Sequence, residues 1–108
     1  MEYIYDVLRK LGADRRYKGF KQIAYLLECS LSCENEKTQT AQLLYRDTAL
    51  HFNCSDSAVE HNIRTLSCRA WKVNPALLTA MCGYPLSDTP TSTEFIKILT
   101  SYLQRNSE

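Results

Sequence analysis

Apolar residues recur every three or four positions along most of this chain, which is the spacing of one face of an α-helix. No stretch alternates apolar and polar residues as a half-buried strand does, and no segment is repeated. We therefore predict an all-α fold of about six helices in one domain spanning residues 1–108. The predicted helices cover about residues 3–11, 19–33, 40–52, 55–71, 76–82 and 92–104.

Residues typical of helix ends support these bounds. Gly12 follows the first predicted helix, where a left-handed residue commonly closes the last turn. Ser55 is a good N-cap for the fourth helix, and the residue before Pro75 is pushed out of helical geometry. Thr91 and Glu94 have the spacing of a capping box, which predicts the start of the last helix.

The third and fourth predicted helices have the outline of a helix-turn-helix covering about residues 40–72. Asn53 lies in the connecting turn and tolerates a left-handed backbone. Helix 19–33 carries apolar residues around much of its circumference, so we expect it to be the central and most buried helix, with Phe20, Ile23, Ala24, Leu27 and Leu31 inward. From the two helices of the motif we expect Leu44, Tyr45, Thr48, Ala49, Phe52, Val59, Ile63, Leu66 and Ala70 to face inward.

The opposite face of helix 55–71 is polar. Its outward and flanking residues are Ser57, Ala58, Glu60, His61, Arg64 and Thr65. Arginine can bind guanine with two hydrogen bonds, glutamate can accept one from cytosine, and serine or threonine can contact bases or phosphates. This set suits a DNA-recognition helix, whose N-terminal part reaches the base edges. A polar outer face is equally typical of any surface helix, so the residues by themselves leave both interpretations open.

Composition and charge narrow the class of protein. The chain has 108 residues, of which 44% are hydrophobic and 23% charged, as in globular rather than disordered proteins. The net charge of +1 is a weak argument for a nucleic-acid partner. However, residues 9–21 hold six basic side chains against one acidic side chain, so this segment is either a phosphate-binding surface or a solvated junction. We find no membrane span and no export signal, and expect a cytoplasmic protein.

The sequence gives little sign of catalytic or metal chemistry. Five cysteines, an odd number, indicate free thiols in a reducing compartment. Cys29 and Cys33 are four residues apart, but there is no CxxC pair, and we expect buried apolar thiols rather than zinc ligands. No nucleophile and base share a suggestive spacing, and no glycine-rich loop is present to hold phosphates. We expect no enzymatic activity, no metal, no cofactor and no small-molecule substrate.

The segment LYRDTALHFNCSDSAVEHNIRTLSCRAW (44–71) resembles the C-terminal effector domain of the stage-zero sporulation response regulator. The resemblance continues in KGF (18–20) and in CGYPLSDTPTSTEFI (82–96), and so covers nearly the whole chain. It implies an all-helical domain with a helix-turn-helix that binds double-stranded promoter DNA, both activating and repressing transcription. It also implies tandem homodimers on DNA, with the contact near the C-terminal helix, about 92–104.

The resemblance assigns the outer face of the second motif helix to bases and phosphates. Ser57, Glu60 and Arg64 match the family pattern. Ala58 and His61 stand where the family has arginines, and Thr65 stands where it has histidine. The loss of two positive charges leaves three outcomes open: a changed DNA site, weaker binding or no binding. In the first motif helix Arg46 replaces a proline of the family and adds a candidate phosphate contact.

Two further expectations concern the role of the chain. The family protein carries a phosphoacceptor receiver domain ahead of this domain, whereas here Met1 leads directly into the first helix, so we expect no phosphorylation switch within this chain. The near-neutral charge also leaves an alternative to DNA binding. The chain can instead be a protein-interaction module that pairs with a full-length regulator and antagonises it.

Overall fold

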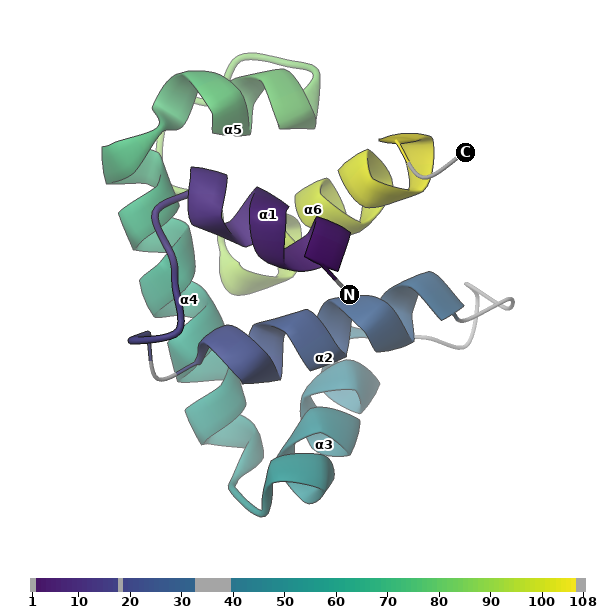
Figure 1. Ribbon diagram of the computed structural model, residues 1–108. Helices are drawn as coiled ribbons and strands as arrows, with labels where there is room; N and C mark the ends of the chain where they lie inside the picture. Colours follow the sequence, from purple (N-terminus) through teal and green to yellow (C-terminus); the bar gives the residue numbers. More distant parts are fainter. Residues whose placement is uncertain (1, 18, 33–39, 107–108) are drawn as a thin grey trace.

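The computed structural model describes residues 2–17, 19–32 and 40–106, which form six helices and no strand (Figure 1). The all-α prediction is confirmed, and each helix lies within two residues of its predicted bounds. The helices are α1 (Glu2–Lys10), α2 (Phe20–Ser32), α3 (Ala41–Phe52), α4 (Asp56–Val73), α5 (Pro75–Cys82) and α6 (Ser92–Asn106).

The predicted helix ends are formed by the expected local interactions. Gly12 has φ of 95°, in the left-handed region. The Oγ of Ser55 accepts a hydrogen bond of 3.1 Å from the backbone N–H of Ala58. In the capping box of α6, the N–H of Glu94 donates to Oγ1 of Thr91 and the N–H of Thr91 donates back to Oε1 of Glu94, each at 3.2 Å. These bonds satisfy backbone donors that a helix leaves free at its first turn.

Helix α2 is the centre of the fold. It contacts α1, α3, α4 and α6, and Figure 1 shows it crossing the molecule between α3 on one side and α1 and α6 on the other. Its fully buried side chains are Phe20, Ile23, Ala24, Leu26 and Leu27, whereas Leu31, near the C-terminal end, is half-buried. The inward positions predicted for this helix are confirmed for four of the five named residues, but α2 is not the most buried helix, because α6 has six buried residues and α2 has five.

Helices α3 and α4 form the predicted helix-turn-helix. Asn53 has φ 55° and ψ 52°, so the left-handed turn residue is confirmed, and its N–H bonds the last turn of α3. The expected inward residues of the two helices are buried, with the exception of Phe52. Phe52 is the last residue of α3, and it is only half-buried because its ring packs edge-on against Tyr25 and His51 near the surface.

The prediction of buried thiols is wrong for the cysteines that the structure describes. Cys54 and Cys68 are exposed, and Cys29 and Cys82 are half-buried. Cys54 lies in the turn between α3 and α4, and Cys68 lies on the side of α4 opposite its apolar stripe, so neither position faces the core. Cys33 lies outside the described residues.

Candidate nucleic-acid interface

Helix α4 buries one side and exposes the other. Its apolar stripe, Val59, Ile63, Leu66 and Ala70, is fully buried. Of the six residues predicted to read DNA from this helix, Ser57, His61, Arg64 and Thr65 are exposed, and Ala58 and Glu60 are half-buried. The structure therefore brings these six residues onto one outer surface, with Ala58 and Glu60 at its two edges.

Polar contacts order the outer surface of α4. Nη2 of Arg64 lies 3.2 Å from Nδ1 of His61, and Oγ1 of Thr65 donates a 2.9 Å bond to the carbonyl oxygen of His61. A guanidinium group has no acceptor, so the His61 ring must accept through Nδ1 and carry its proton on Nε2. Nη1 of Arg64 is also 3.7 Å from Oε1 of Glu60, one helical turn earlier.

Glu60 has a partner that the sequence did not indicate. Its Oε2 accepts a hydrogen bond of 2.5 Å from Oγ of Ser92, the first residue of α6. The spacing of Glu60 and Arg64 by four residues is a readable signal of an ion pair on a helix. No local pattern predicts the Ser92 contact, because it joins residues 32 positions apart.

Arg46 lies apart from the other predicted residues, on α3. It is exposed and makes no ion pair within the part of the chain that the structure describes. It shares the outer side of α3 with Leu43, Asp47 and Leu50, all of which are exposed. Arg46 is therefore available to an external anion, but on the first helix of the motif rather than on the second.

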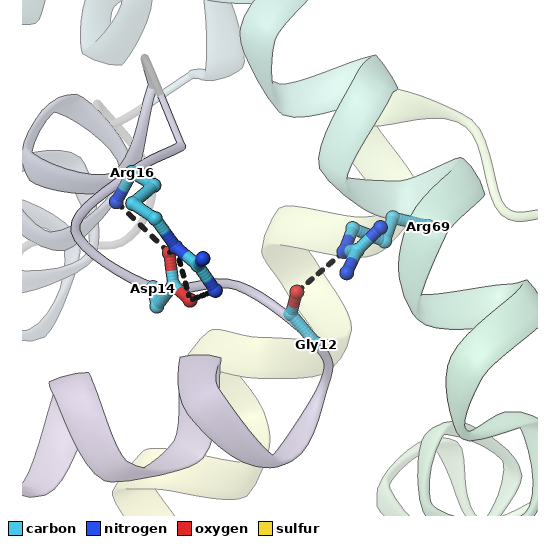
Figure 2. Close-up of polar contacts among 4 residues, drawn as sticks. All are labelled: Gly12, Asp14, Arg16 and Arg69. Carbon is cyan, nitrogen blue, oxygen red and sulfur yellow. Dashed lines mark hydrogen bonds and ion pairs between the residues drawn. The ribbon is translucent and has the colours of Figure 1, made fainter.

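The basic segment 9–21 contacts the C-terminal end of α4. The Nε of Arg69 donates to the carbonyl oxygen of Gly12 (Figure 2), and the Arg69 guanidinium lies 5.7 Å from the centre of the Tyr17 ring. Asn74, just after α4, donates from Nδ2 to the carbonyl oxygen of Lys10 at 3.1 Å. Three interactions thus fix the loop between α1 and α2 against α4.

The same segment meets α4 again where α2 begins. A Cβ atom on Gly19 would lie 2.6 Å from Cβ of Asn62, so only glycine permits this approach. Nδ2 of Asn62 also donates a 2.7 Å bond to Oε1 of Gln22. Because Asn62 is four residues after Ala58 and three before Thr65, the basic segment flanks the Ala58 and Thr65 edge of the outer surface.

Some of the positive charges in this segment are already paired. Arg9 pairs with Asp6 at 2.8 Å, and Arg16 with Asp14 at 2.9 Å (Figure 2). Hydrogen bonds from Arg16 lower the pKa of the Asp14 carboxyl below its ordinary value. Among the described residues, the cations of the segment without an ion pair are Lys10, Arg15 and Lys21, all exposed.

Other candidate sites offer less chemistry. A groove of about 510 Å³ lies between α2, α3 and α6, and among the described residues that line it Lys97 is the only titratable one. No group of three His, Cys, Asp or Glu side chains close enough to hold a metal ion occurs in residues 2–17, 19–32 and 40–106. None of the six helices is sufficiently long and apolar to cross a membrane.

We compared the chain with protein families, curated proteins and solved structures to identify proteins that share this helix-turn-helix. Neither the curated proteins nor the solved structures give a match. The family described as "Sporulation initiation factor Spo0A C terminal" matches residues 4–103, which include α2 to α5 completely and most of α1 and α6. With the match spanning nearly the whole chain and the fold agreeing, the chain belongs to the Spo0A C-terminal family of sporulation-initiation DNA-binding domains.

Proposed function

We propose that this chain is a sequence-specific DNA-binding regulator of transcription in sporulation initiation, with the N-terminal half of α4 in the major groove. The observation that carries the proposal is the exposed set on α4, in which Ser57, His61 and Arg64 project from the side opposite the buried stripe. A recognition helix requires this division, because its inner side must hold it while its outer side reaches base edges. Such a role requires access to DNA, so we also propose a cytoplasmic location.

The residues of α4 divide the reading of bases between them. Arg64 can donate two hydrogen bonds to O6 and N7 of guanine. Oε1 of Glu60, the carboxylate oxygen that Ser92 does not engage, can accept one from N4 of cytosine. His61 offers its Nε2–H as a donor, since Nδ1 is engaged by Arg64. Ala58 is suited to contact with a thymine methyl group rather than with a phosphate.

Phosphate contacts come from the neighbouring elements in this proposal. Lys10, Arg15 and Lys21 belong to the segment that Arg69 and Asn62 hold against α4, and Arg46 extends from α3. The outer face of α4 itself brings little net charge, because Glu60 faces Arg64. Positive charge beside the recognition helix therefore supplies the sequence-independent part of binding.

A fluorescence-anisotropy titration tests both the base readout by α4 and the phosphate contacts. It uses duplexes that carry the sporulation-type promoter box, at several salt concentrations. Arg64→Ala should weaken binding to the preferred duplex by about 1–3 kcal/mol and relax the preference. Arg15→Ala and Lys21→Ala should each reduce the slope of log K against log salt by about 0.9 with little change in preference. Lys72→Ala, in the last turn of α4 and outside its N-terminal half, is the charge-matched control. Failure to bind any duplex at low salt refutes the proposed function.

We also propose that two copies bind DNA in tandem through α6. The groove between α2, α3 and α6 runs beside the exposed Lys97 and Ser101 and offers a surface for the second copy. Sedimentation on duplexes with one and with two half-sites measures the stoichiometry. Binding of a second copy no tighter than the first on the two-site duplex argues against the tandem dimer.

The alternative role is supported by a different observation. The net charge is only +1, and the two oppositely charged residues on the outer face of α4 face each other. A module that pairs with a full-length regulator and antagonises it needs no surplus of positive charge. Co-elution with that regulator, together with the absence of DNA affinity, supports this role. Loss of activity in Arg64→Ala with pairing retained supports DNA binding instead.

A further inference from the structure

Ser92 joins the start of α6 to the outer face of α4. It is 6% exposed, and its Oγ donates the 2.5 Å hydrogen bond to Oε2 of Glu60. The bond engages one oxygen of a carboxylate whose other oxygen, Oε1, faces Arg64 at 3.7 Å. Arg64 in turn contacts His61. A continuous chain of polar contacts therefore runs from a buried hydroxyl to the two exposed side chains at the centre of the outer face.

The segment that presents Ser92 is itself fixed. The buried Oγ of Ser67 on α4 donates a 2.8 Å bond to the carbonyl oxygen of Pro90, two residues before Ser92. The capping box of Thr91 and Glu94 then sets the first turn of α6. The Ser92 hydroxyl thus has little freedom to follow Glu60, and the carboxylate must adopt the position that the hydroxyl offers.

A carboxylate at this place is otherwise weakly restrained. Glu60 has a side chain that is 33% exposed, and the ion pair with Arg64 is long at 3.7 Å, with Arg64 58% exposed. Exposed pairs of this kind hold side chains poorly, because both groups are well solvated. The short bond to a buried hydroxyl is the stronger restraint, since hydrogen bonds to an ionised acceptor are about twice as strong as neutral ones.

We propose that Ser92 is a positioning residue for base readout: by holding Oε2 of Glu60 it aims Oε1 and, through it, the guanidinium of Arg64. This inference rests on the proposed DNA-binding function. Without the hydroxyl, Glu60 turns toward solvent, and Arg64 loses a fixed neighbour and samples more conformations. The reading pair then discriminates less between base pairs, while the phosphate contacts made by other elements remain.

The test compares Ser92→Ala with a control at the other hydroxyl that joins the same two segments. Ser67→Ala removes the bond to Pro90 but keeps the Ser92 hydroxyl and the capping box of α6, so it is expected to lower stability and to change base preference much less than Ser92→Ala does. Duplexes are selected from a random-core pool by the unchanged chain, by Ser92→Ala and by Ser67→Ala. Affinities for the preferred duplex and for its single-base-pair variants are then measured. Circular dichroism and thermal melting confirm that each variant is folded.

For Ser92→Ala we expect the affinity ratio between the preferred duplex and its variants to fall by about tenfold at the base pairs read by Glu60 and Arg64. The salt dependence of binding should stay unchanged, because no phosphate contact is lost. Ser92→Thr keeps a hydroxyl and should restore the ratio. If Ser92→Ala does not fold, Ser92→Cys replaces the hydroxyl with a weak donor of similar size, and the same fall is expected.

Three results overturn the inference. One is an unchanged base preference in folded Ser92→Ala. If Ser92→Ala does not fold, an unchanged base preference in Ser92→Cys has the same meaning. Another is an equal change of preference in Ser67→Ala, which shows that general loosening of the α4–α6 contact is responsible. The third is a further loss of discrimination when Ser92→Ala is added to Glu60→Ala, because the hydroxyl then acts without Glu60. If the unchanged chain selects no duplex at all, the proposed function fails first.

Discussion

Arg69 and Gly12 are joined by a hydrogen bond from the Arg69 Nε to the Gly12 carbonyl oxygen, across 57 residues of sequence (Figure 2). With the Tyr17 ring beneath the same guanidinium, this bond attaches the basic loop to α4. The bond from Asn74 to the Lys10 carbonyl oxygen and the close packing of Gly19 against Asn62 hold the two ends of the loop. Arg69 therefore serves the fold and, if the chain binds DNA, the position of positive charge beside the recognition helix.

We expect Arg69→Ala to lower the free energy of unfolding by about 1–2 kcal/mol, from the lost hydrogen bond and the lost ring contact. Urea denaturation measures this change. Arg69→Lys is the control that keeps the charge, and it should recover little stability, because an ammonium group lacks the planar donor that lies over Tyr17. Full recovery by lysine shows that charge alone matters at this position.

The packing of Gly19 against Asn62 predicts a steric effect. Gly19→Ala should destabilise the fold by about 1–3 kcal/mol, because its Cβ must displace Asn62. Gly83→Ala should also destabilise it, by about 1–2 kcal/mol, but for a conformational reason, since its φ is +86° and a Cβ there meets no atom within 4 Å. Thermal or urea unfolding gives both values.

A double-mutant cycle distinguishes the two causes. Asn62→Gly removes the Cβ that Gly19→Ala would meet, so the cost of Gly19→Ala should shrink in that background. The cost of Gly83→Ala should be the same with and without Asn62→Gly. Additive effects for Gly19 and Asn62 show that the cost of Gly19→Ala does not come from the contact with Asn62.

The sequence predicted those features that depend on local rules. Thr91 and Glu94 form their capping box because both partners lie within one turn, and Asn53 is left-handed because few other residues tolerate that geometry. The inward stripe of α4 follows from periodicity alone. Phe52 was placed in the core by the same periodicity, but it ends its helix and packs at the surface with Tyr25.

The left-handed turn of Asn53 gives a further prediction. Asn53→Gly should be close to neutral, because glycine adopts φ 55° without strain. Asn53→Val should cost about 1–2 kcal/mol or more, since a β-branched side chain is strained in the left-handed region. The midpoint of thermal unfolding reports both. Equal melting temperatures for the two variants indicate that the turn can rearrange.

The pKa of Asp14 gives a prediction for pH. Hydrogen bonds from Arg16 hold the pKa of this carboxyl below its ordinary value of 3.8. A lowered pKa contributes stability that is present above pH 3.8 and is lost as the pH falls through the folded-state value. An NMR titration of the Asp14 carboxyl should show this shift, and Arg16→Ala should return the pKa toward 3.8. An unchanged pKa in Arg16→Ala assigns the shift to the backbone N–H of residue 16, which alanine keeps, or to Arg69.

The candidate site was only partly readable from the sequence. Helical spacing placed Ser57, His61 and Arg64 on one outer face, because that depends on periodicity alone. It could not show that Ser92 engages Glu60, or that Asn62 seats the start of α2, since both contacts join distant parts of the chain. Tertiary packing therefore decides which polar residues of α4 are free and which already have a partner.

Cys68 provides a chemical probe of whether the outer face of α4 meets DNA. Its thiol is exposed on the same side as Arg64, one turn further along the helix. In a variant that keeps Cys68 and replaces the other cysteines by serine, the preferred duplex should slow alkylation by maleimide. With the duplex at about 100 times its Kd, only about 1% of the protein is free, so the rate should fall by up to about 100-fold if the bound form is unreactive.

A matched variant keeps only Cys82, which is half-buried at the end of α5. Because Cys82 lies beside Lys97 and Ser101, on the surface proposed for the second copy, both variants are measured on a duplex with one half-site. The rate of Cys82 without DNA corrects for its lower exposure, so the ratio of rates with and without duplex is compared between the two variants. Protection of Cys68 with no protection of Cys82 means that DNA covers the outer face of α4. Saturation of each variant with duplex is checked by anisotropy. If neither thiol is then protected, DNA binds elsewhere, because a thiol beside Arg64 in the groove cannot stay as accessible as it is in the free chain.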